Sequence, residues 1–368
     1  MTNQPRDTEN PPPAPGPGPA PGEFARPEAP ADLTPTLRTL LTGVTLSAEQ
    51  AATAFEAMMT GRCHHGEMGA LLALLATRTP TPDEILGAAR IMRAHVDRLA
   101  CATDPAEIVD TAGTGGAPKT FNVSTAAAIV AAAAGARVAK HGNRSRTGRG
   151  SAEVLRELGV NVDAPREVQG RCLDEAGVCF CFAIHHHPAT KHVMPVRLAL
   201  GFPTIFNLLG PLTNPAGARR QLMGVYDRRF LTPIAEALAA LGAIRAIVVH
   251  SDDGLDEISI SAPTTLVHIE DGGIREETIA PEQFGLDRAP REAVTARDLP
   301  HAARMIREVL EGRDKGPARD MTVLNAAAAI LVSGRVGSLD DAMDLAGRAI
   351  DDGAAARTLE SLARLSRE

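Results

Sequence analysis

The sequence has no tryptophan, one tyrosine and only 3% aromatic residues among its 368, so the protein itself should contribute little fluorescence. It has no uninterrupted apolar run of about 20 residues, the length that a membrane-spanning helix needs. It has no excess of positive charge: 45 acidic residues outnumber 38 Lys and Arg residues, and the net charge of -7 gives no reason to expect nucleic acid as a partner. The start of the chain lacks the charged and then apolar pattern of a signal peptide. We therefore expect a cytoplasmic protein that binds neither membranes nor nucleic acids.

The sequence also lacks the cysteine pattern of a disulfide framework, because its five cysteines are odd in number and irregularly spaced. They are Cys63, Cys101, Cys172, Cys179 and Cys181. Cys179 and Cys181 alternate with Phe180 and Phe182, a pattern that predicts a buried strand carrying small apolar thiols. A reducing compartment fits this usage.

Hydrophobic residues make up 44% of the chain, which is enough for at least one large core and leaves room for two domains. Residues 1–31 stand apart because Pro, Ala and Gly dominate them. Such a segment cannot bury enough apolar surface to offset the entropy lost on ordering. It is therefore predicted to be a disordered tail.

Residues 32–104 are predicted to form a small all-helical domain. Two capping boxes mark helix starts, Ser47 with Gln50 and Thr81 with Glu84. Apolar residues then recur on one helical face after each of them.

From residue 105 to residue 368 the predicted elements alternate between strands and helices. Strands are expected at 108–109, 137–139 and 243–250, and helices at 124–134, 152–158 and 338–353. This alternation implies parallel strand pairing and an α/β domain.

A glycine loop, Gly113–Gly116, separates the first of these strands from the helix that begins near Ser124. The glycines let backbone N–H groups approach an anion, and the helix start adds its positive end and unpaired N–H groups. Ser124 and Thr125 add hydroxyl groups, and a serine at such a helix start can also hold Mg²⁺. The loop predicts a phosphate site, with a plain tight turn as the alternative.

The next strand is followed by Lys140–Arg144, which carries two fixed positive charges and two further polar groups. Ligands of open α/β sheets lie beyond the carboxyl ends of the strands, so both loops are expected to face one crevice. Either loop alone could be a solvated turn, but the two together favour anion binding.

Several separated blocks of the sequence resemble the signature blocks of the anthranilate phosphoribosyltransferase family and follow one another in the same order. They are GTGG…TFNVST, KHGNR, GSAEVLRELGV, HHPATKHVMPVRLALGFPTIFNLLGPLTNPA and DGLDEIS, beginning at Gly113, Lys140, Gly150, His186 and Asp253. The likeness runs from about Leu37 to the end of the chain. It implies a helical N-terminal domain followed by an α/β domain of the nucleoside phosphorylase/phosphoribosyltransferase-like fold (class III/IV type). It also implies transfer of the phosphoribosyl group from 5-phosphoribosyl 1-diphosphate (PRPP) to the amine of anthranilate in tryptophan biosynthesis.

The resemblance implies a set of residues that contact PRPP. They are Gly113, Gly116, Thr120, Asn122, Ser124, Thr125, Lys140, His141, Gly142, Asn143, Arg144, Ser145, Gly148 and Ser151. Lys140 and Asn143 are the implied catalytic residues. No general base is nominated, because the aromatic amine is uncharged near neutral pH and catalysis would rest on positioning and electrostatics.

The resemblance also implies a Mg²⁺ cofactor held by Ser124, Asp256 and Glu257. Mg²⁺ prefers oxygen ligands and usually takes only one or two carboxylates, together with phosphate and water. Without the resemblance, an Asp-Glu pair after a strand would more often be a solvated loop.

For anthranilate, the resemblance implies Gly113, Asn143 and Arg197. The guanidinium of Arg197 suits a carboxylate because it can donate two parallel hydrogen bonds, and a surface salt bridge is the alternative. His185–His187, near Cys179, invites a zinc hypothesis, but three consecutive histidines cannot all face one ion on regular backbone. The resemblance places the HHP segment near the anthranilate entrance instead.

The sequence departs from the family at two loops. Ala117-Pro118 stands where the family usually has an aspartate after GTGG, and the stretch to Asn122 is one residue shorter. The SRTGRGS run from Ser145 is also shorter than usual, and we expect Arg149 to supply the charge of a missing lysine.

Two alternative functions remain open at this point. A pyrimidine nucleoside phosphorylase shares the architecture but would need a nucleobase pocket in place of Arg197 and Asn143. A non-catalytic relative that binds nucleic acid would need a basic surface, which an acidic chain does not provide. We see no fused glutamine amidotransferase segment, and we expect a homodimer formed through the helical domain.

Overall fold

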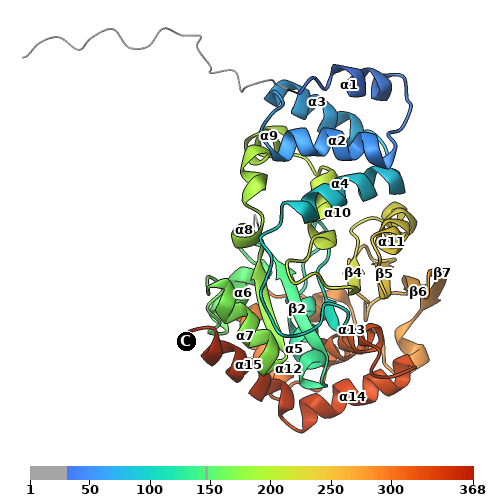
Figure 1. The fold of residues 1–368 in the computed structure, drawn as a ribbon. Coiled ribbons are helices and arrows are strands. Elements are labelled where there is room, and N and C mark those ends of the chain that lie inside the picture. Colours follow the sequence, from blue (N-terminus) through green and yellow to red (C-terminus); the bar gives the residue numbers. More distant parts are fainter. Residues whose placement is uncertain (1–30, 146–147) are drawn as a thin grey trace, which may run out of the picture.

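The computed structural model describes residues 31–145 and 148–368, so the predicted tail lies outside the described residues except for Ala31. Four helices form the N-terminal part (Figure 1): α1 (Thr34–Leu41), α2 (Ala48–Met59), α3 (His65–Ala76) and α4 (Pro82–Ala94). Both predicted capping boxes are confirmed. The Ser47 hydroxyl accepts from the Gln50 N–H, and the Thr81 hydroxyl accepts from the Glu84 N–H.

A seven-stranded sheet forms the centre of the second part, with the order β3-β2-β1-β4-β5-β6-β7. The strands are β1 (Ile108–Asp110), β2 (Arg137–Gly142), β3 (Val178–Phe182), β4 (Arg220–Gly224), β5 (Arg245–Ser251), β6 (Thr264–Glu270) and β7 (Gly273–Ile279). The five strands from β3 to β5 in this order pair in parallel.

The expected parallel pairing is confirmed for these five strands, whereas β6 and β7, which were not among the expected strands, pair antiparallel. Parallel neighbours need a crossover of a dozen or more residues, usually a helix, and no helix separates these strands. Asp271 and Gly272, with φ of 50° and 77°, make the tight turn of a hairpin between β6 and β7. The sheet is therefore mixed.

Helices and short 3-10 turns fill the connections. The α-helices are α5 (Val123–Ala133), α6 (Ser151–Glu157), α7 (Arg166–Ala176), α8 (Ala183–His186), α9 (Met194–Leu200), α10 (Ile205–Leu209), α11 (Leu231–Ala240), α12 (Leu299–Leu310), α13 (Pro317–Ser333), α14 (Leu339–Asp351) and α15 (Ala354–Leu365). The 3-10 turns are η1 (Pro188–His192), η2 (Gly210–Leu212), η3 (Arg228–Phe230), η4 (Pro281–Phe284) and η5 (Arg291–Val294).

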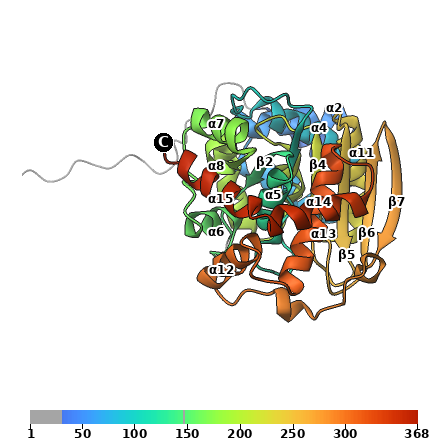
Figure 2. The same ribbon diagram turned by 90° about the horizontal axis from the view of Figure 1, so that it is seen from below.

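Two hydrophobic cores lie on opposite faces of the sheet, because neighbouring strand residues point to opposite sides. Leu222 and Val249 belong to the core built around α5 and α13, whereas Met223 and Val248 belong to the core shared with α11 and α4. Figure 2 shows α13, α14 and α15 crossing the α5 side of the molecule.

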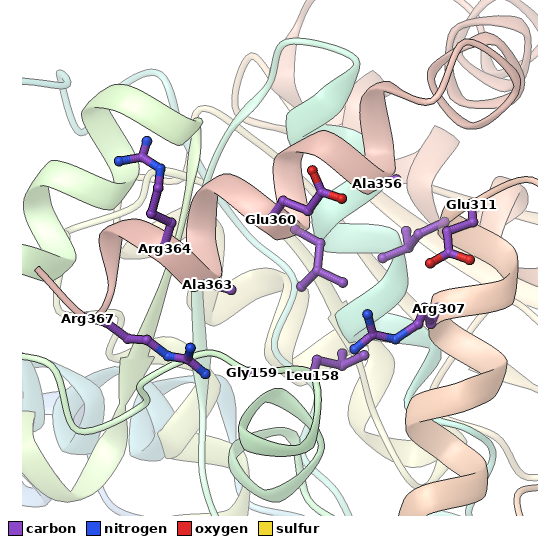
Figure 3. A pocket seen from close by; sticks show the side chains of 11 residues that line it. Leu158, Gly159, Arg307, Glu311, Ala356, Glu360, Ala363, Arg364 and Arg367 are labelled. Carbon is purple, nitrogen blue, oxygen red and sulfur yellow. The ribbon is translucent and has the colours of Figure 1, made fainter.

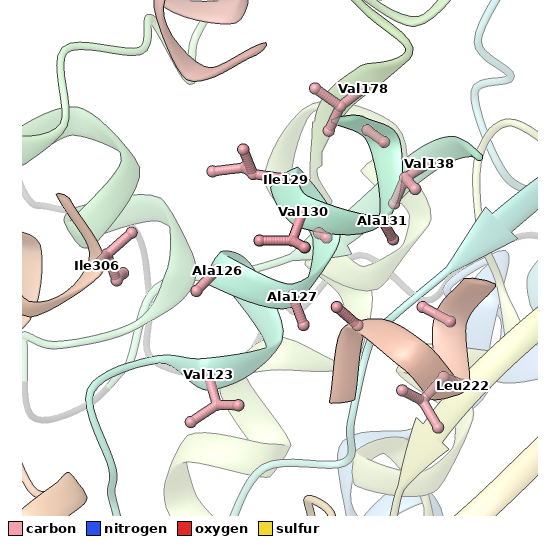
Figure 4. Packing of buried hydrophobic residues seen from close by; sticks show 14 of the residues in the cluster. Val123, Ala126, Ala127, Ile129, Val130, Ala131, Val138, Val178, Leu222 and Ile306 are labelled. Carbon is pink, nitrogen blue, oxygen red and sulfur yellow. The ribbon is translucent and has the colours of Figure 1, made fainter. Parts of the chain in front are cut away.

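Helix α5 lies at the centre of the first core (Figure 4). Its Val123, Ile129 and Val130 are buried among Val138 of β2 and other apolar side chains of the same cluster. Alanines fill most of the remaining positions and are buried as well, so neighbouring elements can approach the helix closely. This packing fixes the helix start, where the predicted phosphate site lies.

Helices α9 and α10 come from the later part of the chain but pack on α3 and α4 (Figure 1). Val193, Ile205 and Phe206 share one core with the N-terminal helices. The helical part of the fold is therefore completed by a segment that follows β3 in the sequence. The domain boundary near residue 104 stays a prediction.

Strand β3 is buried along its whole length, which confirms the prediction made from the alternation of Cys179 and Cys181 with phenylalanine. The two thiols lie 3.8 Å apart in sulfur–sulfur distance. None of the described helices is long and apolar enough to cross a membrane.

Candidate active site

The two predicted phosphate loops follow β1 and β2, which are parallel neighbours, so both loops begin at the same edge of the sheet. The side chain of Lys140, near the end of β2, is buried and reaches across to the first loop. Its Nζ lies 3.1 Å from Ser124 Oγ and 3.5 Å from Thr111 Oγ1. The lysine of the second loop and the helix start of the first therefore meet directly.

The acidic pair after β5 joins the same cluster. Glu257 Oε1 accepts from the backbone N–H of Ser124 at 3.2 Å, and Oε2 accepts from the hydroxyl of Thr120 at 3.0 Å. A Cβ atom on Gly113 would lie 3.0 Å from Asp256 Oδ2, so only glycine leaves this carboxylate its place without adjustment. Ser124, Asp256 and Glu257 thus line one small cavity of about 40 Å³.

The electrostatics of this cavity fit a bound cation. Burial raises the pKa of Glu257 to about 7, and the charge of Asp256 adds to the rise. Burial also raises the pKa of Asp256 above its ordinary value. Burial lowers the pKa of Lys140 to about 8, against the opposite pull of the carboxylates. Three buried carboxyl groups, those of Asp110, Glu257 and Asp256, therefore act on one ammonium group, and a further positive charge would offset their negative charge.

The side chains of Thr111, Ser124, Asp256 and Glu257 offer oxygen atoms to this cavity, and apolar side chains line part of the rest. Within residues 31–145 and 148–368, no three His, Cys, Asp or Glu side chains gather in a way that could hold a metal ion. A cation between Asp256 and Glu257 would depend on these two carboxylates, the Ser124 hydroxyl, and oxygens of substrate and water. That donor set fits Mg²⁺, which keeps several non-protein ligands.

The first loop contains two glycines in the left-handed region, Gly115 and Gly116, with φ of 63° and 96°. A Cβ on Gly116 would lie 3.4 Å from the ring of Tyr226. Asn122 also has a positive φ, 69°, and directly precedes α5. The hydroxyl of Thr125 is buried without a hydrogen-bond partner among the described atoms, which leaves it available to a ligand.

The second loop folds back on α6. Ser151 Oγ donates to the Asn143 carbonyl oxygen at 3.4 Å, and a Cβ on Gly142 would lie 2.2 Å from Ser151 Oγ. The Asn143 side chain is exposed, and its oxygen accepts from the backbone N–H of Arg144. The guanidinium of Arg144 lies 5.5 Å from the centre of the Phe182 ring.

Three further predicted positions complete this loop. Gly148 has φ of 69° and donates its backbone N–H to the carbonyl oxygen of Ser145 at 3.0 Å. Ser145 accepts from the ammonium group of Lys119. Arg149 directs its guanidinium to the Ala296 carbonyl oxygen. Residues 146–147 of the predicted loop lie outside the described residues.

The histidine run divides between three different partners. His185 is partly exposed and pairs with Asp163 at 2.9 Å. His186 is buried, with its two ring nitrogens against the Asp97 carbonyl oxygen and the Gln169 side chain.

His187 pairs instead with His141 through their Nε2 atoms at 3.1 Å. Burial lowers the pKa of His141 well below its ordinary value and lowers the pKa of His187 to about 4, so this pair is neutral at neutral pH. The three side chains of the histidine run therefore diverge rather than converge on one ion.

Arg197 lies on α9 and is half-buried, with its guanidinium 5.2 Å from the centre of the Phe206 ring. Burial lowers the pKa of this guanidinium below its ordinary value. The guanidinium forms no ion pair or hydrogen bond with the part of the chain that the structure describes. The surface salt bridge considered as an alternative is thus not formed there, and a half-buried positive charge remains open to an anion. No hydrogen bond among the described residues joins Arg197 to Asn143 or Gly113.

Comparison with known families gives two adjoining matches. Residues 34–96 match the helical bundle domain of the glycosyl transferase family, and residues 105–356 match its α/β domain. The anthranilate phosphoribosyltransferase of Rubrobacter xylanophilus is 48% identical over 91% of this chain and 98% of its own length. That of Azorhizobium caulinodans is also 48% identical, over 90% and 95%.

This chain belongs to the anthranilate phosphoribosyltransferase family. The crystal structure of the Thermus thermophilus enzyme of this name superimposes with a TM-score of 0.84 at 40% identity, covering 90% of this chain and 99% of that one. The Saccharomyces cerevisiae enzyme, in complex with PRPP and Mg, gives a TM-score of 0.82 at 27% identity, covering 91% and 98%. The expected fold, a helical domain followed by an α/β domain of the phosphoribosyltransferase type, is confirmed.

Sequence reasoning missed two residues at or beside this site. Asp110 is fully buried at the end of β1, and its Oδ1 accepts from the backbone N–H groups of Ala112 and His141. Gly224, at the end of β4, has no room for a side chain, because a Cβ would lie 1.7 Å from the Asp256 carbonyl oxygen. The position of the two residues could have indicated them, because each ends a strand at the edge of the sheet where ligands bind.

The family site is not the most spacious hollow of the molecule. A cavity of about 540 Å³ lies between α12, α15 and the turn at Leu158 (Figure 3). Leucine and alanine side chains line part of it, and Arg364, which also lines it, pairs with Glu368. No buried polar group among its lining residues points to a ligand, so volume alone is a poor guide here.

Proposed function

We propose that this protein transfers the phosphoribosyl group of PRPP to the amine of anthranilate, giving N-(5-phosphoribosyl)anthranilate and diphosphate. The single observation that carries this proposal is the cluster of Lys140, Ser124, Asp256 and Glu257 beside two anion-binding loops. Family membership fixes the reaction class, and the cluster supplies groups for the chemistry of a diphosphate leaving group.

On the donor side, negative charge grows on the diphosphate as its bond to ribose C1 breaks. The Lys140 ammonium, the backbone N–H groups of the glycine loop and the N-terminus of α5 stabilise that charge. These groups are held in place before the reaction, since Lys140 is buried and Ser124 is fixed by Glu257. Such fixed donors need no reorganisation as the charge develops.

Ser124, Asp256 and Glu257 would hold Mg²⁺ in this site. When bound, Mg²⁺ supplies positive charge that offsets the charge of the diphosphate oxygens. Burial raises the pKa of each of the two carboxyl groups, and a cation bound between them would favour their ionised forms.

On the acceptor side, the guanidinium of Arg197 would bind the carboxylate of anthranilate by two parallel hydrogen bonds. The ring of Phe206 contacts the guanidinium on one side by a cation–π interaction. Asn143 and Gly113 would contact the amine side of the same ring. The amine attacks C1 without first losing a proton to a strong base, so the protein mainly positions the two substrates.

We also propose that the protein is a homodimer formed through its helical part. Leu41, Val44 and Leu198 are exposed to 70%, 56% and 74%, and Met194 is exposed as well. Leu41 ends α1, Val44 follows that helix, and Met194 and Leu198 lie on α9; both helices pack on α3. Light scattering at micromolar concentration should give twice the chain mass of 38.6 kDa. Particles of the single-chain mass would contradict the proposal.

The test of the reaction is a fluorescence assay. Purified protein mixed with anthranilate, PRPP and Mg²⁺ should remove anthranilate fluorescence, and the absence of tryptophan keeps the protein background low. Omission of Mg²⁺ or addition of a chelator should slow the loss strongly. A folded protein that consumes no anthranilate but splits a pyrimidine nucleoside with inorganic phosphate would replace the proposed reaction with a phosphorylase activity.

A further inference from the structure

Lys119 is the only charged residue of the loop 111–122, and its side chain reaches out of that loop. Its ammonium group donates to the hydroxyl of Ser145, which belongs to the second loop. Lys119 is half-buried. The two anion-binding loops are thus joined at a second place, away from the buried Lys140.

A second positive charge lies close to this junction. Burial lowers the pKa of Lys119 below its ordinary value, and the charge of Arg149 lowers it further, whereas Glu153 opposes the shift. Glu153 is itself engaged, since its Oε2 accepts from the backbone N–H of Gly150 at 2.9 Å. The positively charged side chains of Lys119 and Arg149 therefore lie near one carboxylate, that of Glu153, which already accepts a hydrogen bond from Gly150.

Side-chain hydrogen bonds hold this junction in place. The Asn122 side-chain amide donates to the Arg149 carbonyl oxygen at 3.2 Å and ties the end of the first loop to the second loop. The adjoining Thr120 hydroxyl donates to Glu257. Lys119 is therefore followed in the chain by Thr120, which is hydrogen-bonded to Glu257 of the acidic cavity, and its own ammonium group contacts Ser145 of the second loop. Its charge is opposite in sign to that of the carboxylates lining the cavity.

We infer that Lys119 binds a phosphate group of the phosphoribosyl donor, together with the hydroxyl of Ser145. This inference rests on the proposed function, since it names the donor whose phosphate is bound. The charge arrangement supports it: the acidic cavity suits a cation, and the adjoining junction of Lys119 and Arg149 suits an anion. A phosphate oxygen at the junction would accept charge-assisted hydrogen bonds from both loops and hold them together.

A purely structural role for Lys119 predicts different behaviour from phosphate binding. As a strut between loops, Lys119 would need only a hydrogen-bond donor for Ser145, and Lys119→Gln retains one. As a phosphate ligand, it needs its charge, which Lys119→Arg retains and Lys119→Gln removes. Lys315, an exposed residue paired with Asp351 far along the sequence, provides the control variant Lys315→Gln.

The experiment is titration calorimetry of the full-length protein without anthranilate, so that no turnover occurs. The ligands are PRPP with Mg²⁺, diphosphate with Mg²⁺, and ribose 5-phosphate. Lys119→Gln should weaken PRPP binding about 10- to 100-fold, the usual loss for one charge-assisted hydrogen bond, while Lys119→Arg and Lys315→Gln stay within about threefold. Whichever of diphosphate and ribose 5-phosphate loses affinity in parallel identifies the phosphate that Lys119 contacts.

Three outcomes would overturn the inference: unchanged PRPP affinity in Lys119→Gln, equal losses in the Gln and Arg variants, or wild-type protein that binds none of the three ligands. The proposed reaction fails in a different way. If the wild type binds PRPP through Lys119 but consumes no anthranilate, the function is wrong and the phosphate contact stands. If turnover is normal and Lys119→Gln binds PRPP as tightly as wild type, the proposed reaction stands and the phosphate contact of Lys119 is wrong.

Discussion

The donor side and the acceptor side of the site are built in opposite ways. On the donor side, Lys140, Ser124 and Glu257 contact one another, and each comes from a different segment beyond the edge of the parallel strands. On the acceptor side, Arg197 stands on a short helix of the helical part and finds no polar partner among the described residues. The donor side is thus a connected network, whereas the acceptor side is a single open group.

This difference predicts that substitutions on the donor side and on the acceptor side should have different effects. Removal of one member of a connected network disturbs its other members, so an effect on the donor side should reach both catalysis and stability. Removal of an isolated group loses only what that group binds. Effects on the acceptor side should therefore fall on anthranilate alone.

The largest effect is expected for Lys140→Ala. The variant loses the ammonium group that faces the leaving diphosphate and leaves Asp256 and Glu257 without their counter-charge. We expect kcat to fall by about 100- to 1,000-fold, the range seen when one fixed electrostatic donor is removed. Anthranilate fluorescence at saturating substrates measures the fall, with Lys315→Ala as the control. Turnover within tenfold of wild type would show that the buried lysine is not part of the catalytic network.

The next effect concerns Asp110, whose pKa burial raises to about 6. In the unfolded chain this carboxyl ionises near its ordinary value, about 3.9, so the folded protein holds the extra proton between about pH 4 and pH 6. The stability contribution of Asp110 is therefore fully present below about pH 4 and is lost as the pH rises through 6. The expected loss is on the order of 2–3 kcal/mol.

Urea unfolding of wild type and Asp110→Asn between pH 4 and pH 7 measures this contribution. An asparagine keeps the oxygen that accepts from Ala112 and His141 but cannot ionise. The free energy of unfolding of the wild type, relative to the variant, should fall across this range. Parallel curves for the two proteins would show that Asp110 does not titrate there, and the donor side would lose its expected sensitivity to pH.

The same contrast explains how much could be predicted from the sequence. Glycines, helix starts and strand ends are local signals, and they predicted the β1–α5 loop and the segment from Lys140, whose members do meet. Strands β6 and β7 and their antiparallel pairing were not predicted, because the residues of a strand carry no mark of the direction of its neighbour. No helix follows β5 before β6, and the turn at Asp271 and Gly272 sets the direction of β7.

Other features could not be predicted because they depend on residues far apart in the sequence. Nothing local to Asp110 indicates that its carboxylate is buried and bonded to the N–H of His141. Nothing local to Lys119 indicates that its ammonium group meets Ser145. The packing of α9 on α3, which fixes where Arg197 stands, is also a long-range contact. Such distances appear only once the chain is folded.

A third prediction tests the acceptor side. Arg197→Ala should raise the KM for anthranilate by about 10- to 100-fold, because one charge-assisted, bidentate contact is lost. The KM for PRPP should stay within about twofold of wild type, since no hydrogen bond or ion pair among the described residues links Arg197 to the donor loops. Steady-state kinetics with each substrate varied in turn measures both values. A parallel rise in the KM for PRPP would show that the two sides are coupled, and the contrast between them would fail.

The smallest effect is expected for His185→Ala, and it sharpens the contrast within the histidine run. The hydrogen-bonded pair of His185 and Asp163 has both side chains exposed, by 39% and 49%, and solvent weakens such pairs, so its loss should change the free energy of unfolding by at most about 0.5 kcal/mol. His187→Ala should cost more, because it leaves the buried ring of His141 without its partner. Urea midpoints and anthranilate turnover of the two variants, measured side by side, test this. Equal losses would mean that proximity to the HHP segment matters more than burial, and that the exposed histidine takes part in the entrance to the site.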